Sequence, residues 1–284
     1  MRYVLLTLLL LFNLQAKSFF SNSEQEDSSA YIGGLKNLII SAQKTRGLTN
    51  SYLNGNTAAM LLVFGNRSDM KKAMETMKSL KLSSDPIINA QAQPIFTAFK
   101  TLNKKAFKSK DSDEVFSTYT QLIQDTLVLA QTVSQRASKE MSPLAKESSL
   151  IMMNIMLPMT EYVGQMRGFG AGLAAKKSAN KEEREKMLAL ASKIQTLNQQ
   201  LQEKMGKLIT QHQDKFPAAL KSQLIAVNTQ SAEYISFVER HFTQEKIDVD
   251  PNSFFDQGTA LITQIVKAYD SANYAISEDA KGWI

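Results

Sequence analysis

Apolar residues recur at spacings of three and four along nearly the whole chain, and no long run alternates between apolar and polar residues. Leu35, Leu38, Ile39 and Ala42 illustrate the pattern, which places all four on one face of a helix. Glycine (12 residues) and proline (6 residues) are scarce, whereas Ala, Leu, Lys, Gln, Met and Glu, which favour helices, are plentiful. The sequence therefore predicts an all-α fold.

Turn and capping signals divide this pattern into eight predicted helices. An acidic cap and a proline open some of them, as in Asp85-Pro86 and Asp250-Pro251. We expect a kink in one helix near Pro158. Eight helices joined by short turns are typical of up-and-down bundles. The predicted helices cover residues 30–53, 68–82, 86–108, 112–135, 142–177, 180–213, 216–243 and 250–277.

The N-terminus has the features of an export signal. Arg2 supplies a positive charge, residues 4–12 form a short apolar core, and residues 14–16 offer a cleavage point. The core is shorter than the roughly 20 residues that span a bilayer. We therefore predict a signal peptide at residues 1–16, a flexible polar leader at residues 17–29, and a periplasmic or secreted protein. The alternative is an uncleaved N-terminal anchor.

Composition argues against several kinds of chemistry. The chain has no cysteine, which excludes disulfides, a thiol nucleophile and cysteine metal sites. No metal-ligand spacing occurs near His212 or His241, and no catalytic triad or phosphate loop is present, so we expect no enzyme activity, metal or cofactor. The net charge of +6, or +5 without Arg2, suits a small anionic ligand. No basic block interleaved with aromatic residues points to nucleic acid.

Two pairs of similar segments occur in the same order along the chain. Arg-Gly followed by an apolar residue occurs at Arg46 and again at Arg167, and residues 116–123 and 255–262 share the pattern Phe-x-x-x-Thr-x-Leu-Ile. The separations between the arginine and the phenylalanine are 70 and 88 residues. This order predicts an internal duplication, with half-repeats at about residues 30–137 and 138–277. The alternative is the general similarity of bundle helices.

Each arginine falls on the apolar face of its predicted helix. Arg46 lies four residues after Ala42, and Arg167 lies four residues after Val163. A buried charge needs a counter-ion or a ligand, and a guanidinium can donate two parallel N–H groups to a planar oxyanion such as nitrate. The alternative is a buried ion pair, for example between Arg167 and Glu161.

Four glycines lie in or beside the Arg-Gly motifs. Glycine inside a helix costs about 1 kcal/mol relative to alanine. This cost predicts that another helix or a ligand approaches these positions closely. The expected packing glycines are Gly47, Gly164, Gly168 and Gly172.

These motifs together resemble the nitrate- and nitrite-sensing (NIT) domain family. Residues 161–168, the small residues that follow and the long polar helix from Asn180 are similar to one part of that domain. Residues 254–262 resemble its closing helix, and residues 43–49 resemble its opening helix. The resemblance covers about residues 31–277, nearly all of the chain after the predicted leader.

The resemblance implies two stacked four-helix bundles that hold a small oxyanion, such as nitrate or nitrite, between helices. It implies Arg46 and Arg167 as ligand contacts, and Arg240 as a further candidate because the family also uses an arginine from a later helix. The opening motif departs from the family pattern, because Thr45 stands where a second basic residue is common. Family members are usually fused to an output domain, for which this chain has no room, so we expect a separate protein partner.

Three functions remain open from the sequence. The first is an exported domain that binds a small anion and relays its presence to a protein partner. The second is a structural or adaptor bundle that binds protein only. The third is a pore-forming bundle using the Gly- and Ala-rich residues 164–175, although Glu161 and Arg167 argue against it. We expect no nucleic-acid partner and no membrane contact beyond the signal segment, and a homodimer remains open.

Overall fold

The computed structural model describes residues 2–53, 57, 59–139 and 141–281, except for the side chains of residues 2–22, 51 and 281. Regular structure within these residues is helical, apart from an isolated β-bridge between Ser178 and Lys246. The main helices are α1 (Arg2–Leu53), α2 (Ala59–Ser79), α3 (Pro86–Lys105), α4 (Ser112–Ala137), α5 (Pro143–Ile151), α6 (Leu157–Lys176), α7 (Lys181–Gln211), α8 (Ala219–His241) and α9 (Pro251–Lys281). Short turns of other helix types are η1 (Lys81–Ser84), η2 (Ala106–Lys108) and η3 (Met152–Met156).

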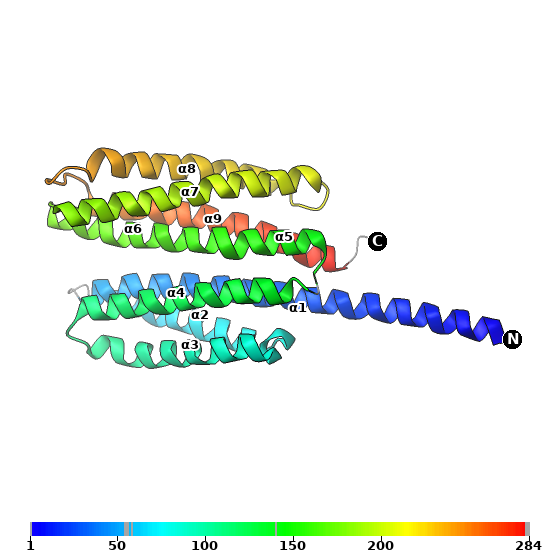
Figure 1. Cartoon of the computed structure of the whole chain (residues 1–284). Helices are drawn as coiled ribbons and strands as arrows, with labels where there is room; N and C mark the ends of the chain where they lie inside the picture. The colour runs from blue at the N-terminus through cyan, green and yellow to red at the C-terminus, as the bar shows by residue number, and fades with distance from the viewer. Residues whose placement is uncertain (1, 54–56, 58, 140, 282–284) are drawn as a thin grey trace.

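The helices form two stacked four-helix bundles (Figure 1). Helices α1 to α4 make the first bundle, and α5 to α9 make the second, in which α5 and α6 act as one helix. Helices α1 and α4 of the first bundle contact α9, α5 and α6 of the second. The prediction of an all-α fold built from two stacked bundles is confirmed.

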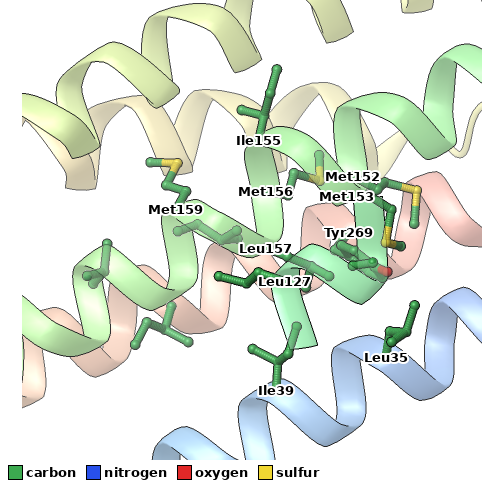
Figure 2. Packing of buried hydrophobic residues seen from close by; sticks show 14 of the residues in the cluster. Leu35, Ile39, Leu127, Met152, Met153, Ile155, Met156, Leu157, Met159 and Tyr269 are labelled. Carbon is green, nitrogen blue, oxygen red and sulfur yellow. The ribbon is translucent and has the colours of Figure 1, made fainter. Parts of the chain in front are cut away.

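An apolar core continues from one bundle into the other (Figure 2). Leu35 of α1 and Leu127 of α4 gather there with Met153 of η3 and Tyr269 of α9, and all four side chains are buried. The hydroxyl of Tyr269 donates a hydrogen bond to the carbonyl of Ile32 at 2.9 Å, which ties α9 to α1. The two bundles therefore share one core, because residues from both exclude water from the same space.

Helices α5 and α6 are joined without a break by η3, a π-helical turn. Pro158 follows this turn, and proline has no backbone N–H to continue the α-helical hydrogen bonds. A π turn is one way in which a helix absorbs such a local disruption. The irregularity expected near Pro158 is therefore a π turn, and it places Met152, Met153 and Met156 in the core.

Two expected helix starts were wrong. Residues 17–29, predicted as a flexible leader, belong to α1. Contact with α9 satisfies polar groups of this segment: the Gln25 amide donates to the carbonyl of Ile276 at 3.0 Å, and the Ser29 hydroxyl bonds the Asn273 amide oxygen at 3.0 Å. Periodicity within one helix does not reveal such a partner. Helix α2 begins at Ala59 rather than at residue 68, and its first turns bury Ala59 against the bundle.

The N-terminal part of α1 projects beyond both bundles (Figure 1). The predicted signal peptide falls in this part, and its side chains lie outside the described residues. No helix in the described part of the chain is long and apolar enough to cross a membrane.

Candidate functional site

Arg46 on α1 is held by side chains from two other helices, α4 and α6, a group that we call the first arginine site. Its guanidinium is 2% exposed and donates to Glu161 of α6, from Nη1 to Oε1 at 2.6 Å and from Nη2 to Oε2 at 3.3 Å. Nη1 also donates to the hydroxyl of Thr120 on α4 at 2.9 Å. The ring of Phe116, one turn earlier on α4, lies 4.9 Å from the guanidinium carbon. The first arginine site is thus a buried, fork-shaped ion pair.

Arg167 on α6 has a similar setting, which we call the second arginine site. Its Nη1 donates to the hydroxyl of Thr259 on α9 at 2.8 Å, and the ring of Phe255, one turn earlier, lies 4.4 Å from the guanidinium carbon. The residue is 7% exposed. No carboxylate within the described residues forms an ion pair with it. Arg167 is therefore a buried cation without a directly bound counter-ion.

The two repeated motifs of the sequence meet in the structure. In each bundle the arginine of the Arg-Gly motif contacts the phenylalanine and the threonine of the Phe-x-x-x-Thr motif. The spacing of four residues puts Phe and Thr on the same face of one helix, so a single guanidinium can reach both. The repetition reflects a shared way of holding an arginine.

Burial governs the electrostatics of the second arginine site. The pKa of Arg167 is lowered to about 10. Desolvation by burial is the main cause and the nearby positive charge of Arg46 adds to it, while Tyr234 and Glu161 act in the opposite direction. Burial also raises the pKa of Tyr234 well above its usual value, which keeps its hydroxyl protonated. The site therefore combines an under-compensated positive charge with a neutral hydrogen-bond donor.

Two buried donors of this site have no hydrogen-bond partner among the described residues: Nε of Arg167 and the hydroxyl of Tyr234 on α8. The Tyr234 hydroxyl and the first side-chain carbons of Arg167 both lie beside Gly258 of α9. A Cβ atom at position 258 would lie 2.7 Å from the Tyr234 hydroxyl oxygen and 2.9 Å from Cβ of Arg167. Buried donors without acceptors are unfavourable, so this cluster is suited to an added acceptor.

A cleft of about 520 Å³ between α4 and α6 leads toward the first arginine site. Its lining includes Phe116, Thr120 and Gln165, each of which contacts Arg46 or Glu161. Lys176 and Lys186 line it together with Asp113 and Glu183, and Lys176 pairs with Glu183 at 3.2 Å, so charges of both signs lie on its wall. The cleft therefore brings solvent close to side chains that contact the buried ion pair of Arg46 and Glu161.

A family model described as nitrate and nitrite sensing matches residues 37–276. The chain belongs to the nitrate and nitrite sensing family. Among solved structures it is similar to the NasR transcription antiterminator, with a TM-score of 0.68 and 13% sequence identity. That match covers 97% of this chain and 74% of the other chain, and it shows a shared fold. The comparison with curated proteins found no match.

The structure places the three candidate arginines of this NIT domain differently. Arg46 and Arg167 are both buried, and they lie close enough for one charge to affect the other. Glu161, expected as a partner for Arg167, pairs with Arg46 instead. Arg240 is exposed on α8, where its Nε donates to the carbonyl of Ser236 at 3.1 Å. The structure does not bring Arg240 into the buried cluster.

The four expected packing glycines fall into two groups. A Cβ at Gly164 would lie 3.5 Å from Nη2 of Arg46, and a Cβ at Gly168 would lie 3.7 Å from the ring of Phe116, so both border the first arginine site. Gly47 and Gly172 have open space where a Cβ would lie, and the packing role expected for them was wrong. Both face away from neighbouring helices, an orientation that the Arg-Gly motif does not encode.

Sequence reasoning missed several members of the site. Thr120, Thr259 and their neighbouring phenylalanines form a repeat in the sequence but were not expected as arginine contacts, although their repeated spacing of four was the available signal. Tyr234 carried no signal, because it has no repeated pattern and comes near Arg167 only through folding. Gln165 contacts Glu161 rather than an arginine, and their spacing of four residues on α6 was the available signal. Within the described residues no group of three His, Asp or Glu side chains could hold a metal ion.

Proposed function

We propose that this NIT domain binds one small planar oxyanion, nitrate or nitrite, at the second arginine site. The observation that carries the proposal is the buried guanidinium of Arg167. Among the described residues it has no carboxylate partner, and neither its Nε–H nor the nearby Tyr234 hydroxyl has a hydrogen-bond partner. An oxyanion would accept hydrogen bonds from both donors and compensate the charge. The family assignment supports the choice of ligand class.

The neighbouring ion pair supports a planar ligand. Two oxygens of the Glu161 carboxylate face two nitrogens of Arg46, which is the fork geometry that nitrate and nitrite can also adopt. The aromatic rings lie against both guanidiniums and exclude water on one side, so hydrogen bonds form along the N–H edges, in the plane of each group. A flat anion with two or three oxygens fits this arrangement.

We propose further that the domain acts outside the cytoplasm and relays anion binding to a separate protein. The N-terminal pattern of a positive charge followed by a short apolar core supports export. The position of the two arginines supports a relay, because Arg46 and Arg167 belong to different bundles that share one core. An anion that is attracted by both charges would change the contacts between the two bundles.

Calorimetric titration with nitrate and nitrite tests anion binding. We expect the Arg167→Met variant to lose affinity by about tenfold or more, because a charge-assisted hydrogen bond contributes about 1.5–3 kcal/mol. Arg240→Met is the matched control, since it removes an exposed arginine and should bind like the unaltered chain. Absence of binding to the unaltered chain, or equal binding by Arg167→Met, would overturn the proposal.

A second candidate function, a structural bundle without a ligand, is favoured by one observation. Arg46 and Glu161 already form a complete buried ion pair. If both arginines served packing alone, nitrate would leave the melting temperature of the domain unchanged relative to chloride at equal ionic strength. The anion-binding proposal predicts a rise, because a ligand that binds only the folded state stabilises it.

A further inference from the structure

Glu161 is a fully buried carboxylate that occupies the anion-binding edge of Arg46. It is 0% exposed, accepts from both terminal nitrogens of Arg46, and also accepts from the Gln165 amide at 2.8 Å. Its carboxylate is planar and carries one negative charge over two oxygens. In shape and charge, the side chain therefore stands where a nitrate or nitrite ion would stand if one were bound to Arg46.

Comparison of the two arginine sites shows that this carboxylate is the main difference between them. Each guanidinium has a phenylalanine ring beside it and a threonine hydroxyl at 2.8–2.9 Å. Glu161 lies six residues before Arg167 on α6, and the position six residues before Arg46 is Ile40. In the repeat, Ile40 of α1 is the counterpart of Glu161 on α6. The first half therefore offers Arg167 no carboxylate in the position from which Glu161 reaches Arg46. Within the part of the chain that the structure describes, one site carries an internal anion and the other does not.

We propose that Glu161 is a tethered competitor, an internal carboxylate that an external oxyanion must displace before Arg46 can join Arg167 in binding it. The part of this inference that concerns Arg167 rests on the proposed function. The replacement of Glu161 by an external anion at Arg46 does not depend on it. Tethering gives the carboxylate a high effective concentration at Arg46, so it lowers the apparent affinity for the external anion.

Displacement of Glu161 would also alter the contact between the bundles. Arg46 lies on α1 and Glu161 on α6, and a second polar contact between these helices, from the Gln43 amide to the Thr160 hydroxyl at 3.3 Å, lies beside the ion pair. Loss of the ion pair frees α1 from its strongest polar link to α6. Helix α1 also extends beyond both bundles (Figure 1). A shift of α1 against α6 would therefore also move the part of α1 that projects from the domain.

Chemical rescue of a Glu161→Ala variant tests the exchange directly. Removal of the carboxylate leaves Arg46 buried without a counter-ion, so the melting temperature should fall. Millimolar formate or nitrate should then raise the melting temperature of Glu161→Ala more than that of the unaltered chain, and should fail to do so in the Arg46→Met, Glu161→Ala double variant. If Glu161→Ala is unfolded, refolding by formate or nitrate, followed by circular dichroism, gives the same answer.

Asp270→Ala provides the matched control. Asp270 forms an ion pair with Lys36 at 2.6 Å that also links the two bundles, but its side chain is 54% exposed. Water can solvate Lys36 after the substitution, so formate and nitrate should give no specific rescue. Rescue of Asp270→Ala as strong as that of Glu161→Ala would mean a general salt effect and would overturn the inference.

A Glu161→Gln variant provides a separate measurement with little change in volume. We expect its affinity for nitrate to exceed that of the unaltered chain by about fivefold or more, in the range of ordinary coupling energies between sites. Unchanged affinity, together with no rescue of Glu161→Ala, would make Glu161 a purely structural partner while leaving the Arg167 proposal intact. Rescue of Glu161→Ala combined with no nitrate binding by the unaltered chain would reject the Arg167 proposal alone.

Discussion

At Arg167 the cost of burying a charge and the capacity to bind an anion have the same origin. The guanidinium lies where water is nearly excluded, its Nε has no acceptor, and its pKa is lowered to about 10. Arg46 is equally buried, but Glu161 compensates its charge. The two arginines share phenylalanine and threonine contacts but differ in the carboxylate, and Glu161 decides which of them has donors available for a ligand.

The lowered pKa of Arg167 predicts how anion binding depends on pH. Because the lowered value favours loss of the proton in the folded state, the guanidinium stays charged below about pH 10 and becomes neutral above it. Nitrate affinity should be constant from pH 7 to 9 and fall as the pH rises through about 10. Calorimetric titrations with nitrate across this pH range measure the affinity. A decline that is already complete below pH 9 would assign the binding to another group.

At the scale of helices, close approach of α6, α8 and α9 positions the second arginine site. Gly258 allows this approach, because the side chains of Tyr234 and Arg167 occupy the space in which a Cβ would lie. Gly47, beside Arg46, has open space instead. Both glycines lie inside long helices, so their substitutions separate the effect of packing from the effect of helix propensity.

Substitution of these two glycines by alanine should change stability in opposite directions. Gly258→Ala should destabilise the fold by about 1–3 kcal/mol, because the new methyl group overlaps Tyr234 and Arg167. Gly47→Ala should stabilise it by up to about 1 kcal/mol through helix propensity alone. Urea unfolding measures both free energies. A neutral Gly258→Ala variant would mean that α9 can move away from α6 at little cost.

At the scale of the whole molecule, the two bundles share one core and are tied by polar contacts between α1 and α9. An anion site that uses an arginine from each bundle needs this rigidity, because a guanidinium binds an oxyanion well only when its edge is held in place. The pairing of α1 with α9 also joins residues that are more than 230 positions apart in the chain.

The shared core predicts that the two bundles unfold together. Calorimetry should show a single transition with equal calorimetric and van't Hoff enthalpies. Tyr269→Phe, which removes the hydrogen bond to Ile32, should lower stability by about 1 kcal/mol without splitting the transition. Tyr274→Phe, at a residue that is 56% exposed on the same helix, is the control and should have little effect. Two separate transitions would show that the bundles fold independently.

The sequence by itself determined the all-α class, most helix positions, the two buried arginines and the repeated motifs that hold them. These features follow from local properties, namely helix propensity, capping and the spacing of apolar residues along one face. Tertiary structure alone decided that Glu161 pairs with Arg46 rather than Arg167, that Tyr234 meets Arg167 at Gly258, and that residues 23–29 are ordered against α9. Each of these depends on which helices become neighbours. That choice is made by the shared core of the two bundles, because burying apolar surface from helices distant in sequence brings their polar side chains together.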